Sequence, residues 1–222
     1  MGRPHDVVTF DCYGTLVDWE QGISEAVIRA AADDGLTLTT DEVLAAHAEI
    51  EPAVQAAGYR SYHDVLVETA LRIARRFDWE LAEDRARFLP QSLPEWQPFP
   101  DTNPALERLA AAGYRLGILS NIDDDLLAGT LRHLSPEFEL QVTAQQVRSY
   151  KPAHAHFRVA RERIGVGRWL HAAQSYFHDV VPARELDIPV AWINRNRDTP
   201  SGEARPDHEF PTLTELATHL CG

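Results

Sequence analysis

The sequence predicts an α/β fold in which a parallel β-sheet lies between two layers of helices and a helical bundle is inserted after the first strand. Residues 101–222 alternate short apolar runs with helical segments, and strands separated by helices of that length form parallel sheets. Residues 20–95 are patterned as helices, with little strand character. A cluster of prolines from Pro90 to Pro100 separates the two patterns and marks a domain boundary.

We therefore expect two domains. The core domain is predicted at residues 1–18 and 97–222, and a helical cap domain is predicted at residues 19–96. Because the cap is inserted at the carboxyl end of the first strand, we expect it to cover that edge of the sheet as a lid.

Local signals predict the individual elements in chain order. In the cap, a capping box at Thr39–Glu42 opens a helix that runs through Val54, and Ser61 opens the next helix. In the core, a helix begins at Asn103 and ends at Gly113. The predicted strands are Asp6–Phe10, Arg115–Leu119, Glu139–Thr143, a strand near Ala173–Phe177 and Pro189–Asn194, with further helices from about Asp123, from Pro152 and at the C-terminus.

Composition excludes several classes of protein. The 222 residues are 44% hydrophobic, which is enough for a buried core, and the net charge of −13 offers no basic surface for nucleic acid. The sequence contains neither an apolar run long enough to span a bilayer nor a signal-peptide pattern, so we expect a cytoplasmic protein without a membrane partner. Cys12 and Cys221 are too few for a disulfide framework or a cysteine metal cluster. A homodimer is left open.

Polar side chains follow the predicted strands. These side chains are Asp11, Ser120, Asn121, His178 and Asp179. The carboxyl ends of parallel strands meet at one edge of a sheet, so we expect these residues to lie together there. The chain has 20 arginines and a single lysine, Lys151, which precedes a predicted helix. A lone lysine suggests a position that requires a compact ammonium rather than a planar guanidinium, although chance would also place it somewhere.

These residues form four short motifs that together resemble the haloacid dehalogenase (HAD) superfamily. The motifs are Asp11-Cys12-Tyr13-Gly14-Thr15, Ser120 after a strand, Lys151-Pro152 and the acid Asp179. The resemblance covers essentially the whole chain. It implies a Rossmann-like core with a small helical cap inserted at the first position.

The chemistry of these side chains agrees with that resemblance. A strand-end carboxylate, Asp11, is placed to act as a nucleophile that forms an ester intermediate. Lys151 should keep it ionised, because a nearby cation lowers the pKa of a carboxyl group. Asp179 should either hold Lys151 or position the hydrolytic water. For Asp11 the alternative is a simple strand-end cap.

Anion binding is expected from Ser120 and from the backbone amides of Cys12 and Tyr13, which would hold the substrate carboxylate or the oxyanion formed during hydrolysis. Ser120 could instead, or in addition, cap the helix that follows it.

Tyr13 distinguishes branches of the superfamily. Phosphatases of the superfamily carry a second aspartate at this position, which protonates the departing alkoxide, and tyrosine is too weak an acid for that near neutral pH. Halide leaves as a stable anion and needs no proton. The sequence therefore resembles the L-2-haloacid dehalogenase branch, in which aspartate displaces halide from C2 and water then cleaves the ester.

A metal cofactor is not expected. The phosphatase pattern Gly-Asp-Ser corresponds here to Ala173-Gln174-Ser175, so a second acid is absent as well. Without these acids Mg²⁺ loses most of its charge complement, and any magnesium would depend on Asp11 and Asp179.

The match to the dehalogenases has gaps. They place an arginine on the first long cap helix to receive the halide, whereas Asp41–Val54 contains none and Arg60 is the nearest substitute. The tyrosine that follows the motif lysine is replaced by Phe157. The helix carries His47, Glu49 and Glu51 instead.

Other segments resemble a neighbouring subgroup, the azetidine-2-carboxylate hydrolases. These segments are SNID (120–123), TAQQVRSYKP (143–152) and SYFHDVVPA (175–183). The reaction of that subgroup opens a strained ring, and a protonated ring amine also leaves without an added acid. Acids in the cap, Glu49 and Glu51, would suit a cationic nitrogen.

We therefore expect a hydrolase that acts through an aspartyl ester on a small carboxylate with a leaving group at C2, most similar to a 2-haloacid dehalogenase. Azetidine ring opening, a Mg²⁺-dependent small-molecule phosphatase and a non-catalytic binding protein are the alternatives. The candidate catalytic residues are Asp11, Lys151, Ser120 and Asp179. The candidate substrate-binding residues are Cys12, Tyr13, Asn121, His178, Ser175 and Arg60. For His178 a packing role is the alternative to contact with substrate or transfer of a proton.

Overall fold

A computed structural model describes residues 3–222 of the chain. It contains two compact units. The core unit comprises the chain up to Val17 together with Pro98–Asn121 and Arg132–Gly222, and the helical unit comprises Asp18–Gln97 and Ile122–Leu131.

The core unit is built on a six-stranded sheet in the order β3-β2-β1-β4-β5-β6, in which every neighbouring pair is parallel. The strands are β1 (Val7–Phe10), β2 (Arg115–Ser120), β3 (Leu140–Thr143), β4 (Trp169–Ala173), β5 (Val190–Ile193) and β6 (His208–Phe210). The central strands are buried along their length, as expected of a parallel sheet covered on both faces. The predicted α/β class and Rossmann-like parallel sheet are confirmed.

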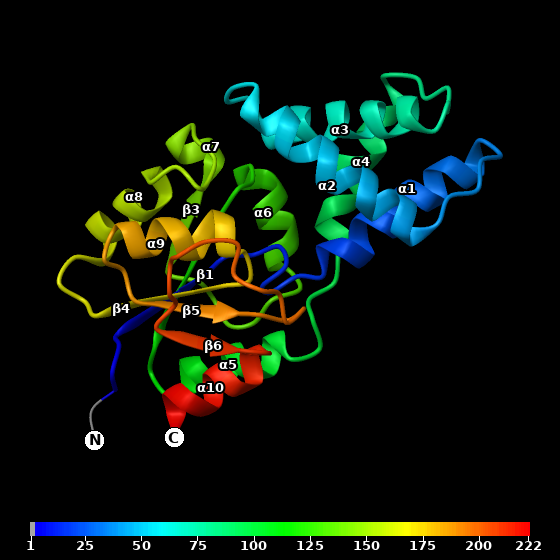
Figure 1. Cartoon of the computed structure of the whole chain (residues 1–222). Helices are drawn as coiled ribbons and strands as arrows, with labels where there is room; N and C mark the ends of the chain where they lie inside the picture. Colours follow the sequence, from blue (N-terminus) through cyan, green and yellow to red (C-terminus); the bar gives the residue numbers. More distant parts are fainter. Residues whose placement is uncertain (1–2) are drawn as a thin grey trace. The chain divides into compact units, whose positions relative to one another are not determined.

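Helices cover both faces of this sheet. Its helices are α5 (Thr102–Ala111), α7 (Ala144–Val147), α8 (Ala155–Ile164), η3 (Tyr176–Val180), α9 (Val181–Glu185) and α10 (Leu213–Cys221). Figure 1 shows α8 and α9 on one face and α5 and α10 on the other. Phe157 of α8, Ala183 of α9 and Trp192 of β5 belong to one buried apolar cluster, which packs α8 and α9 against the sheet.

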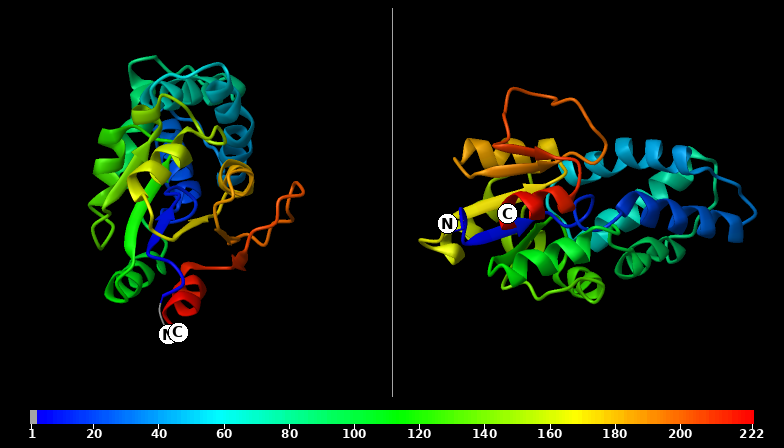
Figure 2. Two further views of the ribbon diagram at one scale, coloured as in Figure 1. Left: turned by 90° about the vertical axis from the view of Figure 1, so that its left-hand side faces the viewer. Right: turned by 90° about the horizontal axis from the view of Figure 1, so that it is seen from below.

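Two predictions about strands were wrong. The strand expected near Ala173–Phe177 ends at Ala173, because Ser175 accepts a hydrogen bond from the backbone N–H of His178 and caps the π-helix η3. Tyr176 and Phe177 lie in this helix. Strand β6 was not predicted, since it is three residues long and pairs only with β5. Figure 2 shows the long loop of residues 194–207 before β6 projecting from the sheet.

The order of the strands reverses at β1, which pairs with β2 on one side and β4 on the other. Crevices at such a reversal, beyond the carboxyl ends of the strands, are where α/β sheets bind ligands. Asp11 directly follows β1. The topology thus puts a carboxyl group at this point of the sheet.

The helical unit contains α1 (Trp19–Asp33), α2 (Thr40–Ala56), α3 (Tyr62–Arg76), η1 (Arg85–Arg87), α4 (Phe88–Ser92), η2 (Leu93–Glu95) and α6 (Asp124–Leu131). The capping box is confirmed: Thr39 and Glu42 bond each other's backbone N–H groups at the start of α2. Ser61 caps α3 as predicted. Asp123 joins α6 to this unit, because its carboxylate accepts the backbone N–H of His63 at 2.9 Å. No helix within residues 3–222 is both long and apolar enough to cross a membrane.

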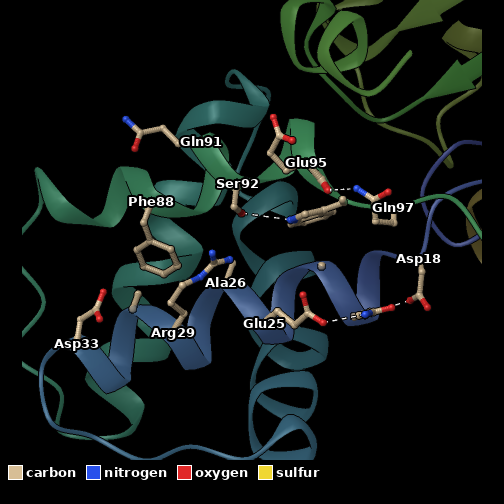
Figure 3. A pocket seen from close by; sticks show the side chains of 14 residues that line it. Asp18, Glu25, Ala26, Arg29, Asp33, Phe88, Gln91, Ser92, Glu95 and Gln97 are labelled. Carbon is tan, nitrogen blue, oxygen red and sulfur yellow. Dashed lines mark hydrogen bonds between the residues drawn. The ribbon is translucent and has the colours of Figure 1, made fainter. Parts of the chain in front are cut away.

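A cavity of about 350 Å³ lies between α1 and the α4–η2 segment (Figure 3). Trp96 lines it and donates its indole N–H to Ser92 at 3.2 Å. Gly22 of α1 packs directly against this indole: a Cβ built on Gly22 would lie 2.3 Å from the ring. The glycine is therefore required by close packing rather than by backbone conformation.

We expect Gly22→Ala to destabilise the protein by about 1–3 kcal/mol, because overpacking outweighs the roughly 1 kcal/mol by which alanine favours a helix. Urea unfolding measures the change. In a Trp96→Leu background, where the indole is gone, the same substitution should become neutral or stabilising. A stabilising Gly22→Ala in the parent chain would contradict the packing argument.

Candidate active site

A tight turn after β1 positions Asp11. Gly14 has a φ of 94°, a conformation that favours glycine, and its N–H donates to the carbonyl of Val17 at 2.8 Å. The backbone N–H of Asp11 donates to Ala172 on the neighbouring strand β4 at 3.2 Å. The Asp11 side chain is held in a buried site, with 7% of the residue exposed.

Lys151 lies between two carboxylates. Its Nζ donates to Oδ1 of Asp11 at 2.8 Å, to Oδ1 of Asp179 at 2.6 Å and to the carbonyl of Leu119 at 2.9 Å. Lys151 is only 2% exposed, so these three acceptors match the three N–H donors of a buried ammonium. A planar guanidinium could not direct its donors in the same way, which gives a physical reason for a lysine at this position.

The pKa values of the two carboxylates shift in opposite directions, although both groups bind the same ammonium. Burial would raise the pKa of Asp179, but Lys151 and the hydrogen bond from His171 more than offset it and lower the value to about 2. For Asp11 burial dominates: its pKa is raised, although Lys151 acts in the opposite direction. Lys151 acts on Asp11 in the predicted direction, but desolvation and the neighbouring Asp179 outweigh its effect on the pKa of Asp11. Burial lowers the pKa of Lys151, and the two carboxylates reverse this, so that its pKa is raised overall.

Asn121 holds the loop that carries Lys151. Its Oδ1 accepts the backbone N–H of Lys151 at 2.7 Å, and its Nδ2 donates to the carbonyl of Lys151 at 3.1 Å. This amide was predicted to bind substrate. In the structure it holds the backbone of Lys151, whose side chain carries the ammonium group.

Ser120, at the end of β2, is 1% exposed, and its Oγ has no hydrogen-bond partner among residues 3–222. The alternative role of Ser120 as a helix cap is therefore wrong. Nε2 of His156 donates to the Ser120 carbonyl at 3.1 Å, while burial lowers the pKa of this imidazole to about 3 and keeps it neutral. The hydroxyl of Ser120 is thus left with its hydrogen-bonding capacity unused.

Ser175 and His178 bond each other. Oγ of Ser175 accepts the N–H of His178 at 3.1 Å and lies 3.0 Å from its Nδ1. Burial lowers the pKa of His178, so its imidazole is neutral near pH 7. Both were candidate substrate contacts, and the structure shows them as the first turn of η3, the helix that presents Asp179.

Cys12 and Tyr13 form the turn between Asp11 and Gly14. The backbone N–H of Cys12 bonds the Asp11 carboxylate, and burial raises the pKa of the Cys12 thiol well above its usual value. Cys12 is therefore a protonated, unreactive thiol that serves through its amide. Tyr13 forms an isolated β-bridge with Val17.

Comparison with known proteins now decides the family. A family model for haloacid dehalogenase-like hydrolases matches residues 5–172. This chain belongs to the haloacid dehalogenase-like hydrolases.

Relatives of this hydrolase match it over nearly its full length. It is 28% identical to (S)-2-haloacid dehalogenase 4A of Burkholderia cepacia over 93% of this chain and 91% of that protein. It is 26% identical to (S)-2-haloacid dehalogenase H-109 of Pseudomonas putida over 98% and 99% of the two chains. Its fold matches L-2-haloacid dehalogenase from Xanthobacter autotrophicus, solved with chloropropionic acid covalently bound, with a TM-score of 0.82 and 21% identity over 98% and 99%.

The described residues offer few acidic donors for a magnesium ion. Residues 3–222 contain no cluster of three or more histidine, cysteine or acidic side chains arranged to hold a metal. Oδ1 of Asp11 and Oδ1 of Asp179 both accept from the Lys151 ammonium. Tyr13 and Gln174 occupy the positions that the resemblance assigns to further acids.

Two residues in this hydrolase's site were missed from the sequence. Thr15 donates its hydroxyl to Oδ2 of Asp11 at 3.1 Å and accepts the N–H of Gln174 at 2.9 Å. His171 lies 2.9 Å from Oδ1 of Asp179. The Gly-Thr turn could have identified Thr15. A histidine within an apolar strand could have identified His171, but the strand was predicted at Ala173–Phe177, after this residue.

The remaining candidates lie in the helical unit. Arg60, the proposed halide contact, is exposed in the loop between α2 and α3. On α2, burial lowers the pKa of His47 to about 4 and raises that of Glu51, so both are driven toward their neutral forms. Glu49 is exposed and pairs with Arg76. The expected acid lining for a cationic substrate is therefore weaker than the sequence indicated.

Proposed function

We propose that this hydrolase removes halide from C2 of short 2-haloacids through an ester on Asp11 and releases the 2-hydroxy acid. The observation that carries the proposal is a buried ammonium, Lys151, held 2.8 Å from Asp11 and 2.6 Å from Asp179, with Tyr13 where an acid would be needed for a poorer leaving group. Its relatives named (S)-2-haloacid dehalogenases support the choice of substrate.

In the first half of the reaction, a carboxylate oxygen of Asp11 attacks C2 and the carbon–halogen bond breaks. The halide leaves with the bonding electron pair, so no proton donor is required at Tyr13. The hydroxyl of Ser120, which has no hydrogen-bond partner within the described residues, binds the carboxylate of the substrate. Lys151 orients the attacking group and offsets its negative charge.

In the second half, water attacks the acyl carbon of the Asp11 ester and gives its proton to Asp179. The bond between the acyl carbon and the ester oxygen breaks, and the departing oxygen takes the second proton of the water, which releases the 2-hydroxy acid and restores the Asp11 carboxylate. The proton on Asp179 then passes to solvent. One water is consumed, and one halide and one proton are released. Because C2 is attacked only once, its configuration should invert.

A panel of C2-substituted acids tests the proposal. The purified protein is incubated with chloroacetate, each enantiomer of 2-chloropropionate, azetidine-2-carboxylate and a phosphomonoester, with assays for chloride, ring-opened product and phosphate. Chloride release with an inverted 2-hydroxy acid is expected. A single turnover in heavy-oxygen water should label the Asp11 carboxylate first. Phosphate release stimulated by Mg²⁺, or ring opening without chloride release, would overturn the assignment.

The raised pKa of Asp11 predicts a pH dependence. Only the ionised carboxylate is a nucleophile, so kcat/KM should be fully present above this pKa and should fall as the pH drops through it. The midpoint of the acidic limb is expected above about 3.9, the ordinary value for aspartate. The profile of kcat/KM against pH measures it, with circular dichroism to show that the protein stays folded. A midpoint at or below the ordinary value would contradict the raised pKa.

A further inference from the structure

His171 is a buried titratable residue for which the reaction above provides no role. It lies on β4 directly opposite Thr9 of β1 and is 0% exposed. Phe157 of α8 packs edge-on against its ring at 5.2 Å. An apolar side chain would fill this place without needing hydrogen-bond partners, so the polar contacts of His171 indicate a specific use.

A chain of hydrogen bonds runs from Trp169 through Thr9 to His171. The indole N–H of Trp169 can only donate, and it donates to Oγ1 of Thr9 at 2.7 Å. The Thr9 hydroxyl is then free to donate to Nδ1 of His171, which lies 2.8 Å away. In that arrangement Nδ1 is an acceptor. Nε2 faces a carboxylate oxygen of Asp179, which can only accept, so Nε2 carries a proton.

The proton on Nε2 is directed at Asp179. Nε2 of His171 lies 2.9 Å from Oδ1 of Asp179, the same oxygen that accepts from Lys151. The other oxygen, Oδ2, is buried and has no hydrogen-bond partner within the described part of the chain. One oxygen of the carboxylate is thus held by two donors, and the other keeps both lone pairs free.

We propose that His171 is a positioning residue for the hydrolytic half of the reaction: with Lys151 it fixes Oδ1 of Asp179, so that Oδ2 is the oxygen that takes the proton from water. The inference rests on the proposed function. The Trp169–Thr9 pair acts one step further away by holding the proton on Nε2.

The inference predicts an effect confined to one half of the reaction. Asp11 attacks C2 without help from Asp179 as a base, whereas hydrolysis of the ester requires it. His171→Leu should therefore leave the first chloride release within about threefold of the parent rate and slow ester hydrolysis by about 10- to 100-fold. The ester should accumulate on the protein.

Rapid mixing with 2-chloropropionate, acid quenching and intact-protein mass spectrometry measure the fraction of protein that carries the ester, and chloride assays measure both the burst and the steady state. His171→Gln, which keeps an N–H donor at the distance of Nε2, should recover at least half of the lost steady-state rate. Thr9→Val should accumulate ester to a smaller extent, and its matched control Thr9→Ser, which keeps the hydroxyl, should not.

Equal slowing of the burst and the steady state in His171→Leu, or a glutamine variant as impaired as the leucine variant, would overturn the inference and leave His171 as a packing residue. If His171→Leu does not fold, the Thr9 pair decides: valine and serine variants with the same ester occupancy would overturn it. If the parent protein forms the ester and releases chloride, and His171→Leu does both at the same rates, only the role of His171 is refuted. A parent that does neither refutes the proposed function, and this inference with it.

Discussion

Asp11→Asn is expected to lower turnover by at least about 10⁴-fold while leaving the protein folded, because an amide oxygen is far too weak a nucleophile to displace a leaving group from carbon. The substitution keeps the size of the side chain, and its one amide oxygen can still accept from Lys151, while the hydrogen bond that Thr15 donates to the other carboxylate oxygen is lost. It removes a carboxylate whose burial is unfavourable. Loss of stability should therefore not explain the loss of activity.

The measurement is chloride release from 2-chloropropionate, together with intact mass after an acid quench. Asp11→Asn should form no ester and should take up no heavy oxygen from solvent. Asp6→Asn is the matched control, since it makes the same chemical change just before the other end of β1, where the carboxylate pairs with Arg168. Turnover by Asp11→Asn close to that of the parent would refute the covalent route.

Lys151→Met should have the second large effect, on both stability and rate. It leaves Asp11 and Asp179 buried and facing each other without a cation, and removal of one member of a buried ion pair costs about 3–5 kcal/mol. Activity should fall by at least about 10³-fold, because the attacking carboxylate loses its orienting partner and is protonated more readily. Urea unfolding and chloride release measure the two effects.

Two further variants separate charge from geometry. Lys151→Arg keeps the positive charge and should recover part of the stability, but its planar donors do not match three acceptors around one point, so the rate should stay low. Adding Asp179→Asn to Lys151→Met removes one uncompensated carboxylate and should restore stability without restoring activity. If Lys151→Met were as stable and active as the parent, the role assigned to the ammonium would be wrong.

Predictability from the sequence differed between the parts of the site. Asp11, Ser120 and Lys151 could be identified because each follows a recognisable strand or precedes a helix, and the carboxyl ends of parallel strands necessarily share one edge. The capping box at Thr39 could be predicted equally well, since it depends on residues close in sequence. Strand β6 could not be predicted from the sequence, because three residues at a sheet edge carry too weak a pattern.

The sequence by itself determined the α/β class, the four motifs and hence the kind of chemistry, because these depend on local patterns and on residue types. The tertiary structure alone decided that the pKa of Asp11 is raised, that Asn121 secures the backbone of Lys151 and that His171 reaches Asp179. Burial and strand register bring together residues as distant as Thr9 and His171, and no local pattern encodes how far each charge is removed from water.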